Sequence, residues 1–106
     1  MINFEEFQKL NLRIGNIIVA EKVEGSNKLL KLKVDLGSEE KQIIAGIATE
    51  YEVEELINRQ IVIVANLEPR VIFGLESQGM LLAVNNDGKL ALLKPDKEML
   101  CGSKIS

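Results

Sequence analysis

The residues best suited to bind a ligand gather in one short segment between two apolar runs. The apolar run from Ile61 to Ala65 ends at Asn66 and Pro69, and the next apolar run begins only at Met80. The segment between them supplies amide, guanidinium and hydroxyl groups, which contact phosphate oxygens or the edges of bases. Its candidates are Asn66, Arg70, Ser77, Gln78 and Met80. Because loops on rigid strands often carry binding groups, we expect a binding site here.

Asn66 and Arg70 each have a structural alternative. Asn66 could satisfy backbone groups at the end of a strand, which is a common use of asparagine, and we weigh the two roles equally. Arg70 is the stronger candidate, because its forked guanidinium can clamp a phosphate or stack on a base. An exposed arginine without a partner is nevertheless common.

Ser77, Gln78 and Met80 also have two alternative roles. The hydroxyl and the amide can contact phosphate or bases, Gly79 would let a ligand backbone approach closely, and the methionine offers a polarizable apolar contact. In the structural alternative, the glycine shapes a turn and the methionine enters the core. Chemistry alone favours the structural alternative.

A second set of candidates is basic and lies on or between the first two expected strands. Lys31 and Lys33 alternate with apolar residues, so they share one solvent-facing side of a strand. Arg13 and Lys28 precede them in the chain. A stripe of this kind is usually just a solvated surface, so the fold must decide whether it binds anything.

The residue inventory excludes several classes of site. The chain contains no histidine and one cysteine, Cys101, so it has no internal disulfide, no His/Cys metal cluster and no Ser/His/Asp triad. No carboxylate stands in an apolar setting that would raise its pKa for acid or base catalysis. We therefore expect no metal, no cofactor and no catalytic residue, and we interpret Cys101 as a small apolar residue.

Length and charge set further limits. With 106 residues, of which 46% are hydrophobic, the chain is expected to form one domain spanning residues 1–106. No long apolar stretch or signal sequence is present, so we expect a cytoplasmic protein without membrane association. The net charge is −3, but Glu50, Glu52, Glu54 and Glu55 are clustered, and the rest of the chain holds twelve acids and thirteen bases. A basic face of modest affinity for nucleic acid is compatible with this distribution.

The elements that must position these residues are mostly strands. Asn3 and Glu6 form a capping-box pattern for a short N-terminal helix, whose Phe4 and Phe7 would be core or interface residues. Period-two and apolar runs predict strands over 12–20, 30–36, 42–47, 61–65, 80–84 and 90–93, with a bulge at Gly15 and a turn at residues 86–88. Helical spacing predicts a helix over 52–58. Three strands, a helix and two more strands are the order of an OB-fold, an all-β five-stranded Greek-key barrel. The remaining ends would form an N-terminal helix and a C-terminal extension.

Several segments together resemble a known family. The most characteristic is Asn66-Leu-x-Pro-Arg70, followed by Gly74 and Ser77-x-Gly-Met80. Others follow in the same order: residues 12–15 (LRIG), 25–30 (GSNKLL), 34–37 (VDLG), 44–47 (IAGI), 95–96 (PD) and 102–105 (GSKI). Over nearly its whole length the chain resembles the tRNA-binding domain of methionyl-tRNA synthetase C-termini, stand-alone structure-specific tRNA-binding proteins and cytokine-like synthetase cofactors. It lacks the histidine-containing segment that some members carry near residue 26, so no role of that histidine is transferred.

The resemblance implies a non-catalytic OB-fold module that recognises the shape of tRNA and assists an aminoacyl-tRNA synthetase, most closely the methionyl enzyme. Its expected partners are tRNA, a second copy of the chain in a homodimer, and the catalytic part of methionyl-tRNA synthetase. The expected tRNA-binding residues are Arg13, Lys28, Lys31, Lys33, Asn66, Arg70, Phe73, Ser77, Gln78 and Met80. Phe73 is the single aromatic residue in this set, which points to recognition of a folded RNA by shape and backbone.

Two alternatives remain at this point. A chaperone-like homodimer of the same fold would bind exposed peptide segments through an apolar groove, and an enzyme is a distant third. The scarcity of aromatic residues and the polar loop favour tRNA over peptide. A start at Met1 suits a separate small subunit, and a C-terminal domain of a synthetase fits the sequence as well.

Overall fold

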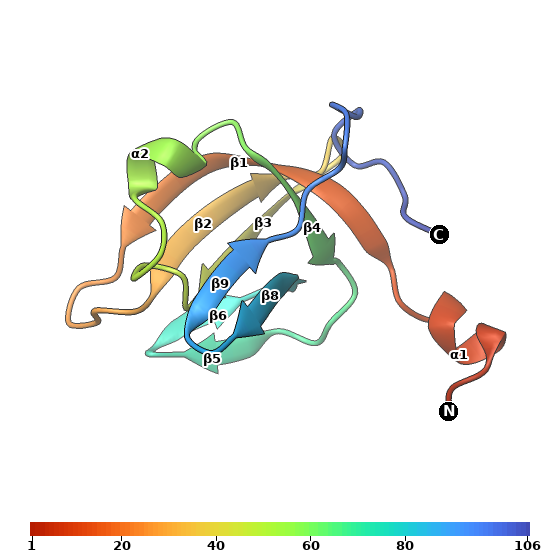
Figure 1. The fold of residues 1–106 in the computed structure, drawn as a ribbon, viewed down its shortest axis with the longest axis horizontal. Helices are drawn as coiled ribbons and strands as arrows, with labels where there is room; N and C mark the ends of the chain where they lie inside the picture. Colours follow the sequence, from red (N-terminus) through yellow and green to blue (C-terminus); the bar gives the residue numbers. More distant parts are fainter.

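Alternating apolar residues build the central sheet. In the computed structural model, which describes residues 1–106, strand β2 (Leu30–Asp35) buries Leu30, Leu32 and Val34 and turns the residues between them outward. This strand pairs antiparallel with β1 (Leu12–Lys22) on one side and with β3 (Glu40–Ala45) on the other. Strand β1 also pairs with β4 (Gln60–Val64), which pairs with the short β7 (Met80–Leu81). The sheet order is therefore β3-β2-β1-β4-β7 (Figure 1).

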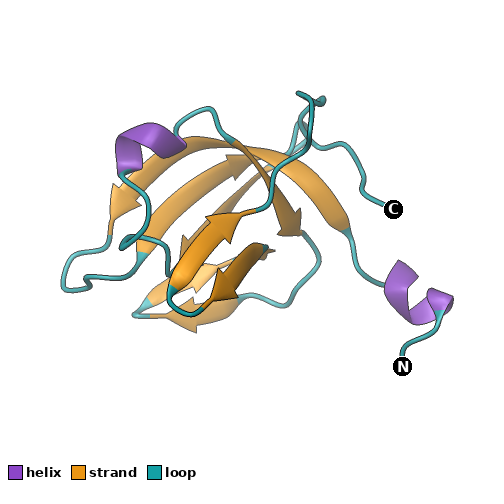
Figure 2. Ribbon diagram, viewed as in Figure 1, coloured by secondary structure: helices purple, strands orange, loops and turns teal.

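The sheet curls into a nearly closed barrel, because its two edges meet. The segment before β7 reaches β3, where the backbone N–H of Gln78 donates to the carbonyl of Gln42 at 2.7 Å. The short helix α2 (Val53–Leu56) lies between β3 and β4 in the chain and buries Leu56 in the core (Figure 2). The expected OB-fold order of three strands, a helix and further strands is thus confirmed.

Two hairpins extend the barrel. Strands β5 (Arg70–Ile72) and β6 (Leu75–Ser77) form the first, and β8 (Ala83–Asn86) and β9 (Lys89–Leu92) form the second. The turn expected at residues 86–88 is confirmed, with Asp87 and Gly88 both at positive φ as a two-residue hairpin turn requires. The single strand expected over 80–84 is wrong. The chain leaves the barrel at Leu82, whose N–H donates to Val62 and whose carbonyl accepts from Leu93.

The bulge expected at Gly15 is also misplaced. Gly15 pairs regularly with Ile61, and the irregularity in β1 falls between Ile17 and Val19. Gly15 lacks a side chain for a different reason, since a β-carbon there would collide with Val34 Cγ1. The glycine allows close packing between neighbouring strands.

The two ends of the chain lie at the same end of the barrel (Figure 1). Helix α1 (Phe4–Gln8) has the expected capping box, in which Asn3 Oδ1 accepts from Glu6 N at 2.9 Å and Asn3 N donates to Glu6 Oε1 at 3.2 Å. No residue of α1 is buried, so its two phenylalanines are not part of the core. The C-terminal extension returns to β1, with Ile14 N donating to Ser103 O at 2.9 Å. Neither helix is long and apolar enough to span a membrane.

Candidate nucleic-acid interface

The outward face of strands β1 to β3 carries the basic stripe. Lys33 sits between Val19 and Gln42 across the sheet, and Lys31 pairs with Glu21, as the period-two pattern predicts. These side chains border a shallow hollow of about 190 Å³. Lys31 Nζ lies 3.7 Å from Glu21 Oε2, and Lys33 Nζ lies 3.9 Å from Glu40 Oε1. Such exposed ion pairs are worth only about 0–1 kcal/mol, so a phosphate group can compete for both lysines.

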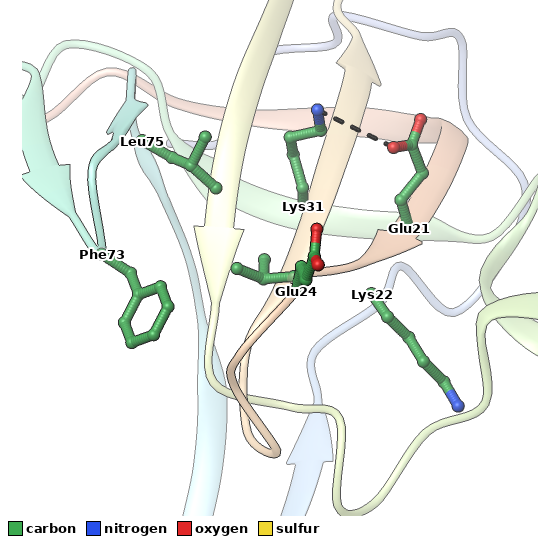
Figure 3. Close-up of a pocket in the computed structure, with 7 residues that line it drawn as sticks. Glu21, Lys22, Glu24, Lys31, Phe73 and Leu75 are labelled. Atoms are coloured by element: carbon green, nitrogen blue, oxygen red, sulfur yellow. Dashed lines mark ion pairs between the residues drawn. The ribbon is translucent and has the colours of Figure 1, made fainter.

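Phe73 stands at the tip of the β5–β6 hairpin, beside this face. Its side chain is 59% exposed, and its backbone has a φ of 54°. The ring lies against the turn between β1 and β2, where a β-carbon on Gly25 would come within 3.4 Å of Phe73 Cε2. A hollow of about 320 Å³ lies between the hairpin and this turn and also touches Lys31 (Figure 3). Phe73 and Lys31 are therefore brought together.

Arg70 and Met80 lie at the base of the same hairpin, on a separate hollow of about 530 Å³. Met80 is 42% exposed, which excludes the alternative that places it in the core. The Arg70 side chain is exposed and takes part in none of the ion pairs or side-chain hydrogen bonds of the chain. Its guanidinium is therefore free to contact a phosphate.

Ser77 is placed differently from our expectation. Its side chain is 3% exposed, whereas a serine that contacts a ligand must lie at the surface. Ser77 Oγ accepts from the backbone N–H of Ile44 at 3.0 Å and donates to the carbonyl of Gly79 at 3.0 Å. The physical reason is that β3 is an edge strand of the sheet. The backbone N–H of Ile44 on its free side has no neighbouring strand to pair with and needs another acceptor. Ser77 supplies that partner.

Gln78 also contacts the edge of β3, through Gln42, which the sequence does not identify as a candidate residue. Gln78 Oε1 accepts from Gln42 N at 2.8 Å, and Gln42 Nε2 donates to the carbonyl of Glu76 at 2.7 Å. Gln42 pairs with Lys33 across the sheet, but this register is set by the structure, and the burial along β3 does not alternate, so no local sequence pattern identifies Gln42. Gln42 and Gln78 fix the hairpin that carries Arg70 and Phe73.

The close approach expected at Gly79 is made by the protein itself. A β-carbon on Gly79 would lie 2.9 Å from the carbonyl oxygen of Val64 on β4. The glycine therefore lets β7 pair with β4, and a ligand backbone is not needed to explain it.

Asn66 and Arg13 belong to a third group, centred on Asn11. Asn66 Oδ1 accepts from Asn11 N at 2.8 Å, and Asn66 Nδ2 donates to Lys9 O at 2.7 Å. Arg13 Nε donates to Asn11 Oδ1 at 3.0 Å, and its Nη1 donates to Gly102 O at 2.9 Å. Both side chains thus hold the chain ends against the barrel. Lys28 is exposed in the turn between β1 and β2 and lines none of the three hollows.

Residues 12–104 match the family model described as "Putative tRNA binding domain". The chain belongs to the tRNA-binding domain family. Curated relatives include methionine–tRNA ligases of Caldanaerobacter subterraneus and Methanothrix thermoacetophila, each 55% identical over 105 residues and 99% of this chain. This tRNA-binding domain spans only 16% of the length of those relatives.

Solved structures of the family share the fold of this tRNA-binding domain. The MetRS-related protein of Pyrococcus horikoshii is 36% identical with a TM-score of 0.94, and the match covers 100% of this chain and 98% of that one. The chaperone CsaA of Bacillus anthracis is 39% identical with a TM-score of 0.90, covering 100% and 99% of the two chains. The barrel is therefore common to proteins described as synthetase-related and as chaperones.

Proposed function

We propose that this tRNA-binding domain is a non-catalytic module that binds tRNA by its shape and raises the local tRNA concentration at an aminoacyl-tRNA synthetase, the methionyl enzyme in particular. The catalytic part of that synthetase and tRNA would be its partners, and the cytoplasm its compartment. Among solved structures, identity does not separate the two interpretations, because the MetRS-related protein is 36% identical and the chaperones are 39% and 31% identical. The tRNA-binding family model and the methionine–tRNA ligase relatives at 55% identity support tRNA over the chaperone alternative.

The observation that carries the proposal is that Arg70 has no internal partner and lies beside the exposed Met80. Arg70 is on the β5–β6 hairpin, whose tip lies beside the lysine face, the outward side of β1 to β3 that carries Lys31 and Lys33. A guanidinium without an internal partner can neutralise a phosphate, and a methionine beside it offers an apolar contact to a sugar or base. We assign direct tRNA contact to Lys28, Lys31, Lys33, Arg70, Phe73 and Met80. The remaining predicted residues, Arg13, Asn66, Ser77 and Gln78, would act by holding the backbone in place.

A homodimer is part of the proposal. Phe4 is 69% exposed on α1, next to a groove of about 90 Å³ lined by α1 and the end of the chain. Exposed aromatic residues on a helix that buries nothing are unfavourable in water, and a two-fold contact would cover them. Two copies would also present two sets of the proposed tRNA-contact residues to one elongated tRNA.

Titration of bulk tRNA, and of two unrelated elongator tRNAs, into the chain at several salt concentrations tests this function. We expect micromolar affinity that falls with salt, because phosphate contacts release counterions. The two tRNAs should bind alike, since shape and backbone contacts carry no sequence information. A preference of more than about 100-fold for one of them would contradict recognition by shape.

A further inference from the structure

The hollow beside Phe73 has a charge pattern that does not suit a phosphate. Its charged lining residues are two acids and two bases: Glu21, Glu24, Lys22 and Lys31. Lys31 lies 3.7 Å from Glu21 and also borders the hollow on the outward face of β1 to β3, and Lys22 points away from Phe73 (Figure 3). Glu24 forms no ion pair, and its carboxylate lines the same hollow as Phe73, where it repels phosphate and accepts hydrogen bonds.

The apolar part of the hollow offers a flat surface. Phe73 and Leu75 form one side, and Glu24 and Lys31 stand on the other (Figure 3). Phe73 is held out by a turn in which both it and Gly74 have positive φ, an unfavourable conformation for a residue with a large side chain. A two-residue hairpin turn requires positive φ at both positions and usually contains Asn-Gly or Asp-Gly, so the turn by itself does not explain the exposed phenylalanine.

We propose that this hollow binds one unstacked nucleobase of the RNA, stacked on Phe73, with its hydrogen-bond donors directed at Glu24. The inference rests on the proposed function and adds a subsite to it. Guanine is the best fit, because its N1–H and N2–H groups lie side by side and can both donate to one carboxylate. Uracil has one N–H donor on that edge and binds more weakly. The occupant is thus the uncharged part of a nucleotide, while Arg70 and Lys33 contact the backbone.

Three short RNA duplexes that differ only in the presence and identity of one bulged nucleotide isolate this contact. The probes are a perfect duplex, the same duplex with one bulged guanosine, and the same duplex with one bulged uridine. We expect the whole chain to bind the guanosine bulge about tenfold more tightly than the perfect duplex, since stacking one base on an aromatic side chain is worth about that much. The uridine bulge should gain less.

Variants of the hairpin provide the decisive comparison. Phe73→Ala should remove the gain from either bulge, so that this variant binds all three probes with one affinity, and Phe73→Trp should restore the gain. Glu24→Ala should remove the preference for guanosine over uridine. Val71→Ala is the matched control, because Val71 is 75% exposed on the same hairpin and does not line the hollow. It should bind all three probes like the unmodified chain.

Several outcomes would overturn the inference. Binding of tRNA without any gain from a bulge would remove the base subsite and leave the proposed function standing. An equal loss on the perfect and bulged duplexes in Phe73→Ala would make the ring part of a general surface. If Phe73→Ala weakened binding of an unfolded arginine-containing peptide and left the bulge gain intact, the hollow would be an arginine site for peptides. Failure to bind tRNA at all would reject the proposed function together with the subsite.

Discussion

The side-chain Oε1 of Gln78 accepts a hydrogen bond from the backbone N–H of Gln42 at 2.8 Å, while the backbone N–H of Gln78 donates to the carbonyl of Gln42 at 2.7 Å. One residue thus satisfies both backbone groups of another, 36 positions away. This reciprocal contact joins the edge of β3 to the hairpin that carries Arg70 and Phe73. It links the stability of the barrel to the position of Arg70 and Phe73, two of the proposed tRNA-contact residues.

Gln78→Ala should lower the free energy of unfolding by about 1–3 kcal/mol, because the half-buried N–H of Gln42 loses its acceptor. The affinity for tRNA should fall as well, since the hairpin is less firmly held. Urea denaturation and tRNA titration measure the two effects. Asn85→Ala removes an exposed amide from the other hairpin and should change neither. Loss of tRNA affinity at unchanged stability would instead make Gln78 a direct contact.

Ser77→Ala should also destabilise the fold, by about 1–3 kcal/mol, because the buried N–H of Ile44 is left without a partner. The midpoint of urea unfolding should fall at an unchanged m-value. Ser38→Ala, at an exposed serine in the turn after β2, is the matched control and should stay within about 0.5 kcal/mol. Equal stability of the two variants would show that the Ser77 hydroxyl is dispensable for closing the barrel.

Arg70→Ala should weaken the binding of all tRNAs to a similar extent and reduce the slope of log affinity against log salt by roughly one unit, because one fewer counterion is released. Arg59→Ala is the matched control, since Arg59 lies over the Tyr51 ring at 5.1 Å and lines none of the three hollows of the candidate interface. Its slope should be that of the unmodified chain. An unchanged slope and affinity in Arg70→Ala would mean that Arg70 does not touch the RNA.

Cys101 should react slowly with alkylating agents. Burial raises the pKa of the Cys101 thiol, so the reactive thiolate is scarce in the folded chain at pH 8. The unfolded thiol ionises near its ordinary pKa of about 8.5, so folding favours the protonated form and this contribution to stability is lost as the pH rises above that value. Iodoacetamide should therefore modify the urea-unfolded chain faster than the folded chain, with the ratio narrowing at higher pH. Equal rates at pH 8 would contradict the shift.

Sedimentation equilibrium should show a dimer of the 11.8 kDa chain at tens of micromolar. Phe4→Ser should shift the equilibrium towards monomer, because it removes exposed apolar surface from α1. The barrel should remain folded, since Phe4 contributes nothing to its core. A single monomeric species in the unmodified chain at these concentrations would remove the dimer from the proposed function.

Local sequence patterns predict the helices and strands that depend on residues close together in the chain. The alternation in β2 follows from one buried face, and the capping box of α1 follows from two residues three positions apart. Sequence patterns do not predict the β5–β6 hairpin, because its turn is Phe73-Gly74 and lacks the usual Asn-Gly or Asp-Gly signal. They indicate a loop over this segment.

The role of Ser77 could not be predicted for a different reason. A serine two residues before a glycine resembles an exposed turn, and the group that it satisfies belongs to Ile44, 33 positions earlier in the chain. Nothing near Ser77 in the sequence reveals that β3 ends a sheet there. The shared face of Lys31 and Lys33 is confirmed, because period two depends on neighbouring residues alone, whereas contact of these lysines and of Arg70 with RNA stays a prediction.

The attachment of both chain ends to the start of β1 has an architectural consequence. Residues 101–105 run beside Leu12 and Ile14, while the turn after β1 and the tip of the β5–β6 hairpin lie at the opposite end of the barrel (Figure 1). A polypeptide fused to either end would leave the molecule on the side away from Phe73. Both chain ends therefore lie apart from the surface around Phe73. Fused domains of very different size could be attached at either end and leave that surface accessible.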